Sequence, residues 1–372
     1  MKELPPSTVY FANLRARGPR ENKLARITKL FRTAGFKKLT EAGPLTAVKV
    51  HFGEMGNDTF VNPVLVRAVV DNLKKHGANP FLTDTATLYS GSRHNGVDHL
   101  NTAILHGFGP EVTGAPVIIA DGLRGDNWRS VKVSHKHFKE VKIASAILEA
   151  DSLLIVSHFK GHEMAGFGGA IKNLAMGCAP PAGKRDQHSP RFHVNQQTCV
   201  GCAECLRVCP QKAVTIKDRK ASINKKACIG CGECMTVCRT KSIAMDWETE
   251  LLPFTERLVE YASGALKGRE GQIGFINFLV NITPDCDCAS WSDAPIVPDI
   301  GILASTDPVA IDKACFDLVN AQTGLAGSHL SRNLAPGENK FLGAWKHTKG
   351  DVQLSYAEKI GLGSTRYVLK EI

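Results

Sequence analysis

Two runs of cysteines with one common spacing are the residues of this 372-residue chain whose chemistry is clearest. The first run is Cys199, Cys202, Cys205 and Cys209, and the second is Cys228, Cys231, Cys234 and Cys238. Both read C-x2-C-x2-C-x3-C, a spacing that holds cubane [4Fe–4S] clusters and in which the fourth cysteine ligates the other cluster. We therefore assign one cluster to Cys199, Cys202, Cys205 and Cys238, and a second to Cys228, Cys231, Cys234 and Cys209. Zinc is the alternative, but zinc motifs usually pair two CxxC units across a longer gap.

The segment from residue 191 to residue 246 resembles bacterial two-cluster ferredoxins. The resemblance rests on the repeated spacing and on Pro210, which directly follows the last cysteine of the first run. The sequence departs from that pattern at Arg239, where proline would usually follow the second run. The resemblance implies a compact module with two [4Fe–4S] clusters that transfers electrons.

A second polar segment, residues 158–174, is rich in glycine, histidine and lysine. It follows an apolar run at 153–156 that predicts a buried parallel strand, and ligands bind beyond the carboxyl ends of such strands. A helix expected to begin at Ala170 would favour an anion at its N-terminus. The pattern predicts a small anionic ligand bound by Lys160, Gly166, Gly168, Gly169 and, from another segment, Arg93. The alternative is a tight turn with surface charges.

Proton transfer on that ligand would need titratable groups at the same edge. Asp84 ends the strand predicted over residues 80–84, so it can face the same crevice. We expect His158, His162, Lys172 and Asp84 to be the catalytic candidates, with the two histidines moving protons. Cys286 and Cys288 flank an aspartate after another predicted strand. They could bind a metal, act in redox exchange, or be small buried side chains.

The rest of the chain alternates strand and helix patterns. Strands are expected over 46–52, 80–84, 116–120, 151–157, 272–282, 299–304 and 367–372, and helices from Asn62 to Gly77 and over 98–106, 142–149, 170–176, 254–266, 306–321 and 355–360. This alternation predicts an α/β fold with a mostly parallel sheet, interrupted by a small α+β ferredoxin-like module. The expected parts are residues 1–190, 191–246 and 247–372, although two separate α/β domains flanking the module are an alternative.

The formal net charge is +10, and residues 191–246 contribute ten Lys and Arg against four Asp and Glu. A basic surface around an electron port favours an acidic carrier such as a ferredoxin or flavodoxin. Nucleic acid ranks low, since we find no recognisable binding motif. No apolar run is long enough to cross a membrane, and the N-terminus does not read as a signal peptide. Twelve cysteines without an export signal favour a reducing, cytoplasmic compartment.

Beyond the cysteine module, the chain resembles the uncharacterised Fe–S-centre proteins called domain of unknown function 362. The resemblance rests on residues 83–85, 158–162, 166–174, 286–288, 299–303 and 307–312. The glycine-rich loop with Lys172 is also distantly similar to lactate-racemase-like proteins. Three hypotheses follow: an Fe–S-dependent oxidoreductase acting on an anionic ligand, an electron-relay or binding subunit without its own chemistry, and an isomerase whose clusters are structural.

Overall fold

This computed structural model describes residues 5–89, 91–189, 192–225, 227–228, 230, 232–245 and 247–372. The predicted cluster ligand Cys231 and the predicted module boundaries at 190–191 and 246 lie outside the described residues. The central element is an eight-stranded sheet of order β16-β1-β15-β14-β7-β2-β3-β4. Its strands are β1 (Ser7–Asn13), β2 (Leu45–Val50), β3 (Asn79–Asp84), β4 (Val117–Ile119), β7 (Ser152–His158), β14 (Ile273–Leu279), β15 (Gly301–Ser305) and β16 (Tyr367–Glu371).

The predicted fold class is confirmed, because β14, β7, β2, β3 and β4 pair in parallel. β15 runs antiparallel to its neighbours β14 and β1, and β16 runs parallel to β1. β7 precedes the cysteine module in the chain and β14 follows it, yet the two strands are neighbours in the sheet. After β2 the chain moves toward β3, whereas after β7 it moves toward β14, so the chain direction switches between β2 and β7. Open α/β sheets bind ligands at such a switch point.

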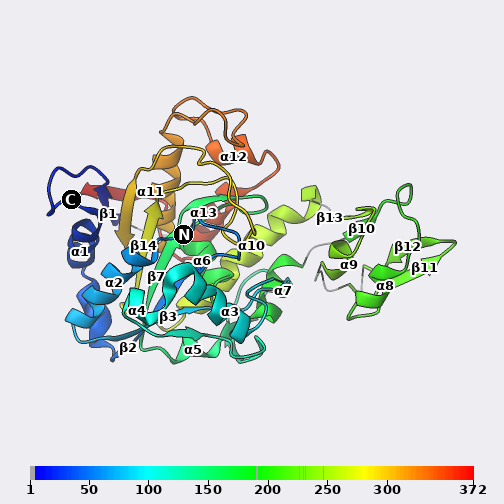
Figure 1. Cartoon of the computed structure of the whole chain (residues 1–372), viewed down its shortest axis with the longest axis horizontal. Coiled ribbons are helices and arrows are strands. Elements are labelled where there is room, and N and C mark those ends of the chain that lie inside the picture. Colours follow the sequence, from blue (N-terminus) through cyan, green and yellow to red (C-terminus); the bar gives the residue numbers. More distant parts are fainter. Residues whose placement is uncertain are drawn as a thin grey trace.

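Helices cover both faces of the sheet (Figure 1). One face packs on α1 (Lys23–Thr33), η1 (Phe36–Glu41), α2 (Pro63–Lys75), α3 (Gly96–Ala103) and η2 (Ile104–Phe108), with α4 (Pro110–Thr113) beside them. The other face packs on α5 (Ser145–Glu149), α6 (Ala170–Ala175), α10 (Trp247–Leu266), α11 (Pro308–Asn320), α12 (Lys340–Ala344) and α13 (Gly350–Lys359), and α7 (Pro181–His188) contacts α10.

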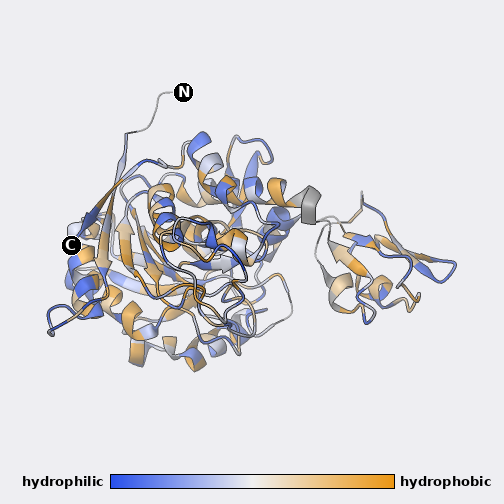
Figure 2. Cartoon of the chain, turned by 90° about the horizontal axis from the view of Figure 1, so that it is seen from above, coloured by the Kyte–Doolittle hydropathy of each residue, from blue (hydrophilic) through white to orange (hydrophobic). Residues whose placement is uncertain are grey.

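The apolar residues of β7 show why the sheet needs both layers. Leu153 and Ile155 join the core on the α6 side, whereas Leu154 and Val156 join the core on the α2 side. Side chains alternate between the two faces of a strand, so a continuous apolar run needs cover on both sides. Figure 2 shows hydrophobic colouring along the central strands and mixed colouring on the helices around them.

Two helix starts have the expected caps. The Asn62 side chain accepts a hydrogen bond from the backbone of Val64, and Asp307 caps α11 in the same way. The helix predicted over 142–149 is wrong in its first half, where β6 (Glu140–Ala144) pairs antiparallel with β5 (Trp128–Lys132). Val141 and Ile143 are both buried, which is the two-residue period of a strand.

The cysteine-rich segment forms its own small antiparallel sheets. β10 (Phe192–Val194) pairs with β13 (Ile243–Met245), and β11 (Val214–Lys217) pairs with β12 (Lys220–Ile223), with α8 (Glu204–Val208) and α9 (Glu233–Thr236) alongside. The β10–β13 pairing brings the two ends of the segment together, as an insertion requires. The segment projects from one end of the molecule in Figures 1 and 2. Within the described residues, no helix has the length and apolar character needed to span a bilayer.

Candidate functional site

The sheet gathers most of the predicted polar residues at the carboxyl ends of β2, β3 and β7. Asp84 ends β3, His158 ends β7, and the short hairpin of β8 (Lys160–His162) and β9 (Gly166–Gly168) follows directly. Cys286, Asp287 and Cys288 lie in the loop after β14. These segments are far apart in sequence, and the parallel arrangement brings them to one edge.

Asp84 is buried among three basic side chains. Its carboxylate lies 2.9 Å from Lys49 Nζ, 3.5 Å from Arg93 Nη1 and 3.7 Å from His99 Nε2. Burial alone would raise the pKa of Asp84, but Lys49 and His99 hold it well below its usual value. Lys49 also donates to Asn173 Oδ1 at 2.7 Å, which ties β2 to α6. Asp84 is therefore an ionised centre of a buried network.

Arg93 is the second ion-pairing centre at this edge. Its Nε lies 3.1 Å from Glu54 Oε2, and its Nη2 donates to Tyr89 Oη at 2.8 Å. Tyr89 in turn donates to the backbone carbonyl of Cys288 at 2.8 Å. Arg93 thus links the loop after β2 to the loop after β14.

Asp287 joins the glycine-rich segment to the cysteine loop. His158 Nδ1 lies 2.9 Å from Asp287 Oδ1, and Lys160 Nζ lies 2.9 Å from Asp287 Oδ2. Burial raises the pKa of Asp287, but the charges of His158 and Lys160 outweigh it and the pKa falls below its usual value. His158 Nε2 faces the carbonyls of Val280 and Asn281, each at 2.9 Å. Both ring nitrogens of His158 are therefore engaged with acceptors, which suits positioning better than proton transfer.

Cys286 and Cys288 lie beside Lys172 and His162. Lys172 Nζ is 3.4 Å from Cys286 Sγ, and the ligand atoms of His162, Cys286 and Cys288 all lie within 4.8 Å of one another. A hydrogen bond from Cys288 lowers the pKa of Cys286 well below its usual value, against the effect of burial and with help from Lys172. The same hydrogen bond and burial raise the pKa of Cys288. The shared hydrogen bond thus favours the thiolate form on Cys286 and the thiol form on Cys288.

The expected anion site at the N-terminus of α6 is filled by a carboxylate of this chain. Asp312 on α11 accepts hydrogen bonds from the backbone N–H groups of Ala170 at 2.7 Å and Ile171 at 2.9 Å. A Cβ at Gly169 would lie 2.3 Å from Asp312 Oδ1, so this glycine makes room for that carboxylate. These two N–H groups therefore already have an internal acceptor, and the anionic ligand expected in this segment stays a prediction.

The basic residues at this edge of the sheet also have negative partners. Lys49 and Arg93 pair with Asp84, Arg93 also with Glu54, Lys160 with Asp287, and Lys172 with Cys286. An anionic ligand would have to displace these pairings. The structure brings Lys160, Lys172 and Gly168 together, since a Cβ at Gly168 would lie 3.3 Å from Lys172 Cδ and 3.7 Å from Lys160 Cε. Gly166 instead packs against Gly350 at the start of α13.

A cavity of about 530 Å³ opens beside the cysteine loop. Its lining includes Cys288, Tyr89, Glu163, Trp291 and Trp345. Cys288 is partly exposed, whereas Cys286 is only 2% exposed and lies behind it. Of the two cysteines, Cys288 is therefore the one that lines this cavity.

The cysteine module contains two small cavities, and each mixes the two cysteine runs. One is lined by Cys199, Cys202, Cys205 and Cys238. The other is lined by Cys209, Cys228 and Cys234, and Cys231 lies outside the described residues. Each cavity therefore takes its fourth cysteine from the other run.

Backbone N–H groups in the module point at cysteine sulfurs. Ala221 donates to Cys199 Sγ at 3.3 Å, Ala213 to Cys209 Sγ at 3.2 Å and Ser242 to Cys238 Sγ at 3.2 Å. Hydrogen bonds to the sulfurs stabilise negative charge on thiolates and tune the reduction potential of a cluster. The donor set and these N–H groups thus fit two iron–sulfur clusters.

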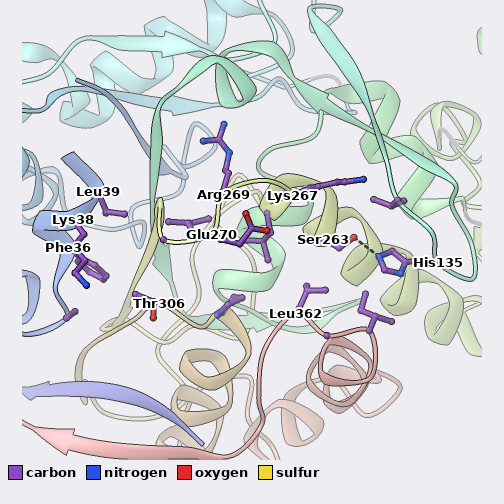
Figure 3. A pocket seen from close by; sticks show the side chains of 18 of the residues that line it. Phe36, Lys38, Leu39, His135, Ser263, Lys267, Arg269, Glu270, Thr306 and Leu362 are labelled. Carbon is purple, nitrogen blue, oxygen red and sulfur yellow. Dashed lines mark hydrogen bonds between the residues drawn. The ribbon is translucent and has the colours of Figure 1, made fainter. Parts of the chain in front are cut away.

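A further cavity, of about 800 Å³, lies at the opposite end of the sheet (Figure 3). Its lining includes Phe36, Lys38, His135, Lys267 and Leu362, and His135 Nε2 is 2.8 Å from Ser263 Oγ. Its lining also includes Ile273, which begins β14, so the cavity lies at the amino end of that strand, away from the ion-paired network. This cavity contains no residue of the predicted site.

Sequence reasoning missed several residues of the network. Lys49 lies inside a strand pattern, and Glu54 stands in a loop without a motif, so neither belonged to a recognisable motif. Lys184 on α7 donates to Thr85 Oγ1 at 2.5 Å, and burial lowers the pKa of Lys184 to about 8. Burial likewise raises the pKa of Asp121 to about 6. A buried lysine in an otherwise apolar strand is the one signal that would have pointed to Lys49.

Comparisons with known proteins give a family and weak fold likenesses. The family model described as "Domain of unknown function (DUF362)" matches residues 46–317. The lactate racemase apoprotein from Thermoanaerobacterium thermosaccharolyticum is 11% identical with a TM-score of 0.44, and the match covers 86% of this chain and 60% of that one. A structural-genomics target from Thermotoga maritima is 10% identical with a TM-score of 0.32, covering 71% of this chain and 52% of that one. No curated protein matches. These likenesses are too weak to support an argument about function.

Proposed function

This chain belongs to the DUF362 family, whose description names no activity, and we propose from its own residues that it is an iron–sulfur protein transferring electrons through two [4Fe–4S] clusters. The observation that carries the proposal is the pair of cysteine-lined cavities in the projecting module. One contains Cys238 with the first three cysteines of the first run, and the other contains Cys209 with Cys228 and Cys234. This exchange of the fourth cysteine is the ligation pattern of two-cluster ferredoxins.

The module supplies what two clusters need from a protein. A [4Fe–4S] cluster, when bound, accepts or gives one electron at a potential set by charge, hydrogen bonds and exposure. The N–H groups of Ala213, Ala221 and Ser242 would stabilise the added negative charge. Cys202 is exposed, as are the neighbouring apolar side chains of Val200 and Leu206. This edge is our proposed port for electrons.

We propose an acidic electron carrier as the partner at that port. The side chains of Arg207, Lys212, Lys217, Arg219 and Lys241 are exposed on the module. Opposite charges speed encounter, and salt screens them. Reduction by a small ferredoxin or flavodoxin should therefore slow as ionic strength rises, whereas reduction by a neutral chemical reductant should not.

The clusters exchange electrons with a second molecule besides the carrier at the port. We propose that this second electron acceptor or donor reacts at the carboxyl edge of the large sheet. An anionic ligand there would have to exchange with the internal partners of Arg93 and Lys160. Lys160→Met should then weaken the effect of such a ligand on the clusters' spectra. If the spectra of wild type and Lys160→Met respond alike to every anion tested, the protein acts as a relay without a site of its own.

The proposal is tested by the metal content of protein purified without oxygen. It should hold about eight irons and about eight acid-labile sulfides per chain, and dithionite should produce the electron paramagnetic resonance signal of reduced [4Fe–4S] clusters. Cys178→Ala is the matched control, because Cys178 is buried outside both runs and should not change the iron content. Protein that contains zinc instead of iron, or iron that does not reduce, would overturn the proposal.

A further inference from the structure

The cysteines of the loop after β14 are not used by the proposed clusters. Their sulfurs lie within 4.8 Å of one another. The loop forms a turn here, in which the Ala289 N–H donates to the Cys286 carbonyl at 2.9 Å. Asp287 itself points away from them and is held by His158 and Lys160. Both cysteines lie in the unit formed by the large sheet, and neither belongs to the two runs assigned to the clusters.

The loop is held in place by its backbone as well. The Glu54 N–H donates to the carbonyl of Asp287 at 2.9 Å, and Tyr89 donates to the carbonyl of Cys288. A Cβ at Gly161 would lie only 2.2 Å from the carbonyl oxygen of Pro284, so the loop packs directly on the β8 backbone. The two sulfurs are therefore kept close together before any ligand arrives.

Lys172 and His162 place positive and hydrogen-bonding groups on Cys286. The Lys172 ammonium is 3.4 Å from its sulfur, and this lysine is half-buried. Lysine or histidine beside a cysteine favours the thiolate, which is the nucleophilic form. Cys178 and Cys315 are also buried, but burial raises the pKa of both thiols. Among these non-cluster cysteines, Cys286 is the one whose pKa is lowered and whose sulfur lies 3.4 Å from an ammonium group, and Cys288 is its neighbouring thiol.

Two features argue against a metal at this pair. His162 Nδ1 accepts hydrogen bonds from the backbone N–H groups of Met164 at 3.0 Å and Ala165 at 3.1 Å, so its proton lies on Nε2. Histidines that bind metals through one nitrogen donate from the other, which is the reverse of this arrangement. The Lys172 ammonium would also repel a cation bound to Cys286.

We propose that Cys286 and Cys288 form a redox-active dithiol that reduces a small disulfide bound in the adjoining cavity. Cys288 faces the cavity and attacks first, after its proton passes to Cys286. A sulfur–sulfur bond forms between Cys288 and half of the disulfide, and the other half leaves as a thiol with the proton from Cys286. The Cys286 thiolate then attacks Cys288, the internal disulfide forms, and the second half leaves as a thiolate that takes a proton from water. Two electrons pass from the cysteines to the small disulfide.

The cavity selects the class of disulfide. Trp291 and Trp345 give it flat apolar walls, and Glu163 and Asp285 add carboxyl groups. The Asp285 carboxyl accepts from Trp291 Nε1 at 3.2 Å, and burial raises its pKa. A small disulfide without negative charge suits this lining better than an anionic one, because carboxylates repel like charge. Cystamine, which carries two amines, is a suitable probe.

The test uses the tryptic peptide from Glu270 to Lys313, which contains Cys286 and Cys288 and no other cysteine. The full protein is treated with cystamine at pH 7, and free thiols are then alkylated. After digestion with trypsin, the mass of the peptide is measured by mass spectrometry. We expect this peptide to carry no alkyl group and to have a mass two hydrogens below that of its dithiol form. Cys178 and Cys315 should remain thiols and become alkylated. In Cys286→Ser, Cys288 should retain a cysteamine adduct, because no second thiol releases it.

Lys172→Met should slow formation of the disulfide at least about tenfold at pH 7, which corresponds to one unit in the pKa of the attacking pair. Lys217→Met is the control, since this exposed lysine lies in the cysteine module and should leave the rate unchanged. A wild-type peptide that remains fully capped at both cysteines after cystamine would overturn the proposal. So would a bound metal that protects both cysteines in wild type and is lost in His162→Ala. Iron content reports on the clusters separately, so either idea can fail alone.

Discussion

Replacing Asp287 with asparagine tests whether the ion pairs at the carboxyl edge hold the two halves of the site together. Asp287 is fully buried and faces His158 and Lys160, each with a contact of 2.9 Å. Asparagine keeps the shape but removes the charge, which leaves two basic groups buried without their counterion. Removing one partner of a buried ion pair costs about 3–5 kcal/mol. For a chain of this size we expect a fall in melting temperature of about 4–6 °C.

The dependence on pH follows from the direction of the shift. The pKa of Asp287 is lower in the folded protein than in the unfolded chain, so its stabilising effect is fully present above the unfolded pKa of about 3.9. That effect is lost as the pH falls through the lower folded pKa. The stability difference between wild type and Asp287→Asn should therefore be constant above about pH 5 and shrink below about pH 4.

Urea denaturation at several pH values measures the stability difference between wild type and Asp287→Asn. A double-mutant cycle with Lys160 measures the coupling between the two residues. Lys160→Met removes one of the two basic groups left without their counterion, so the double variant should lose less stability than the sum of the single variants. Asp126→Asn serves as the control, because this exposed aspartate should change stability by less than about 0.5 kcal/mol. A loss below about 1 kcal/mol for Asp287→Asn, or strict additivity with Lys160→Met, would refute the reasoning.

Three further variants test other parts of the molecule. Cys209→Ala should damage the cluster held mainly by the second cysteine run, and a spectrum showing loss of the first-run cluster would contradict the exchange of ligands. In the wild type, the free energy of unfolding should rise between about pH 8 and pH 10.5, because the pKa of Lys184 is lowered in the folded protein and the unfolded chain binds one more proton there. Lys184→Met should reduce this rise. Urea denaturation at several pH values measures it, and equal slopes in the two proteins would contradict the prediction. Gly161→Ala should destabilise the protein by about 1–3 kcal/mol, since the new methyl group meets the Pro284 carbonyl; an unchanged denaturation midpoint would show that the loop adapts.

The cysteine module shows how far local sequence reasoning reaches. The spacing of the two runs predicted the exchange of Cys209 and Cys238, and the two cavities have that composition. Such a module is determined locally, because three ligands of each cluster lie within seven residues of one another. The α/β class was likewise readable from alternating strand and helix patterns, and the caps at Asn62 and Asp307 were readable from residue type.

The site at the sheet edge was decided by tertiary structure. The glycine-rich segment and the N-terminus of α6 looked like an anion site, but Asp312 comes from 142 residues away to occupy it. Lys49 and Glu54 gave no motif, and they joined the network only because parallel strands place their carboxyl ends together. The sequence determined which charged residues exist and roughly which strands they follow. Only the folded chain determined which charges neutralise one another, because burial excludes water and forces each charge to find a partner within a few ångströms.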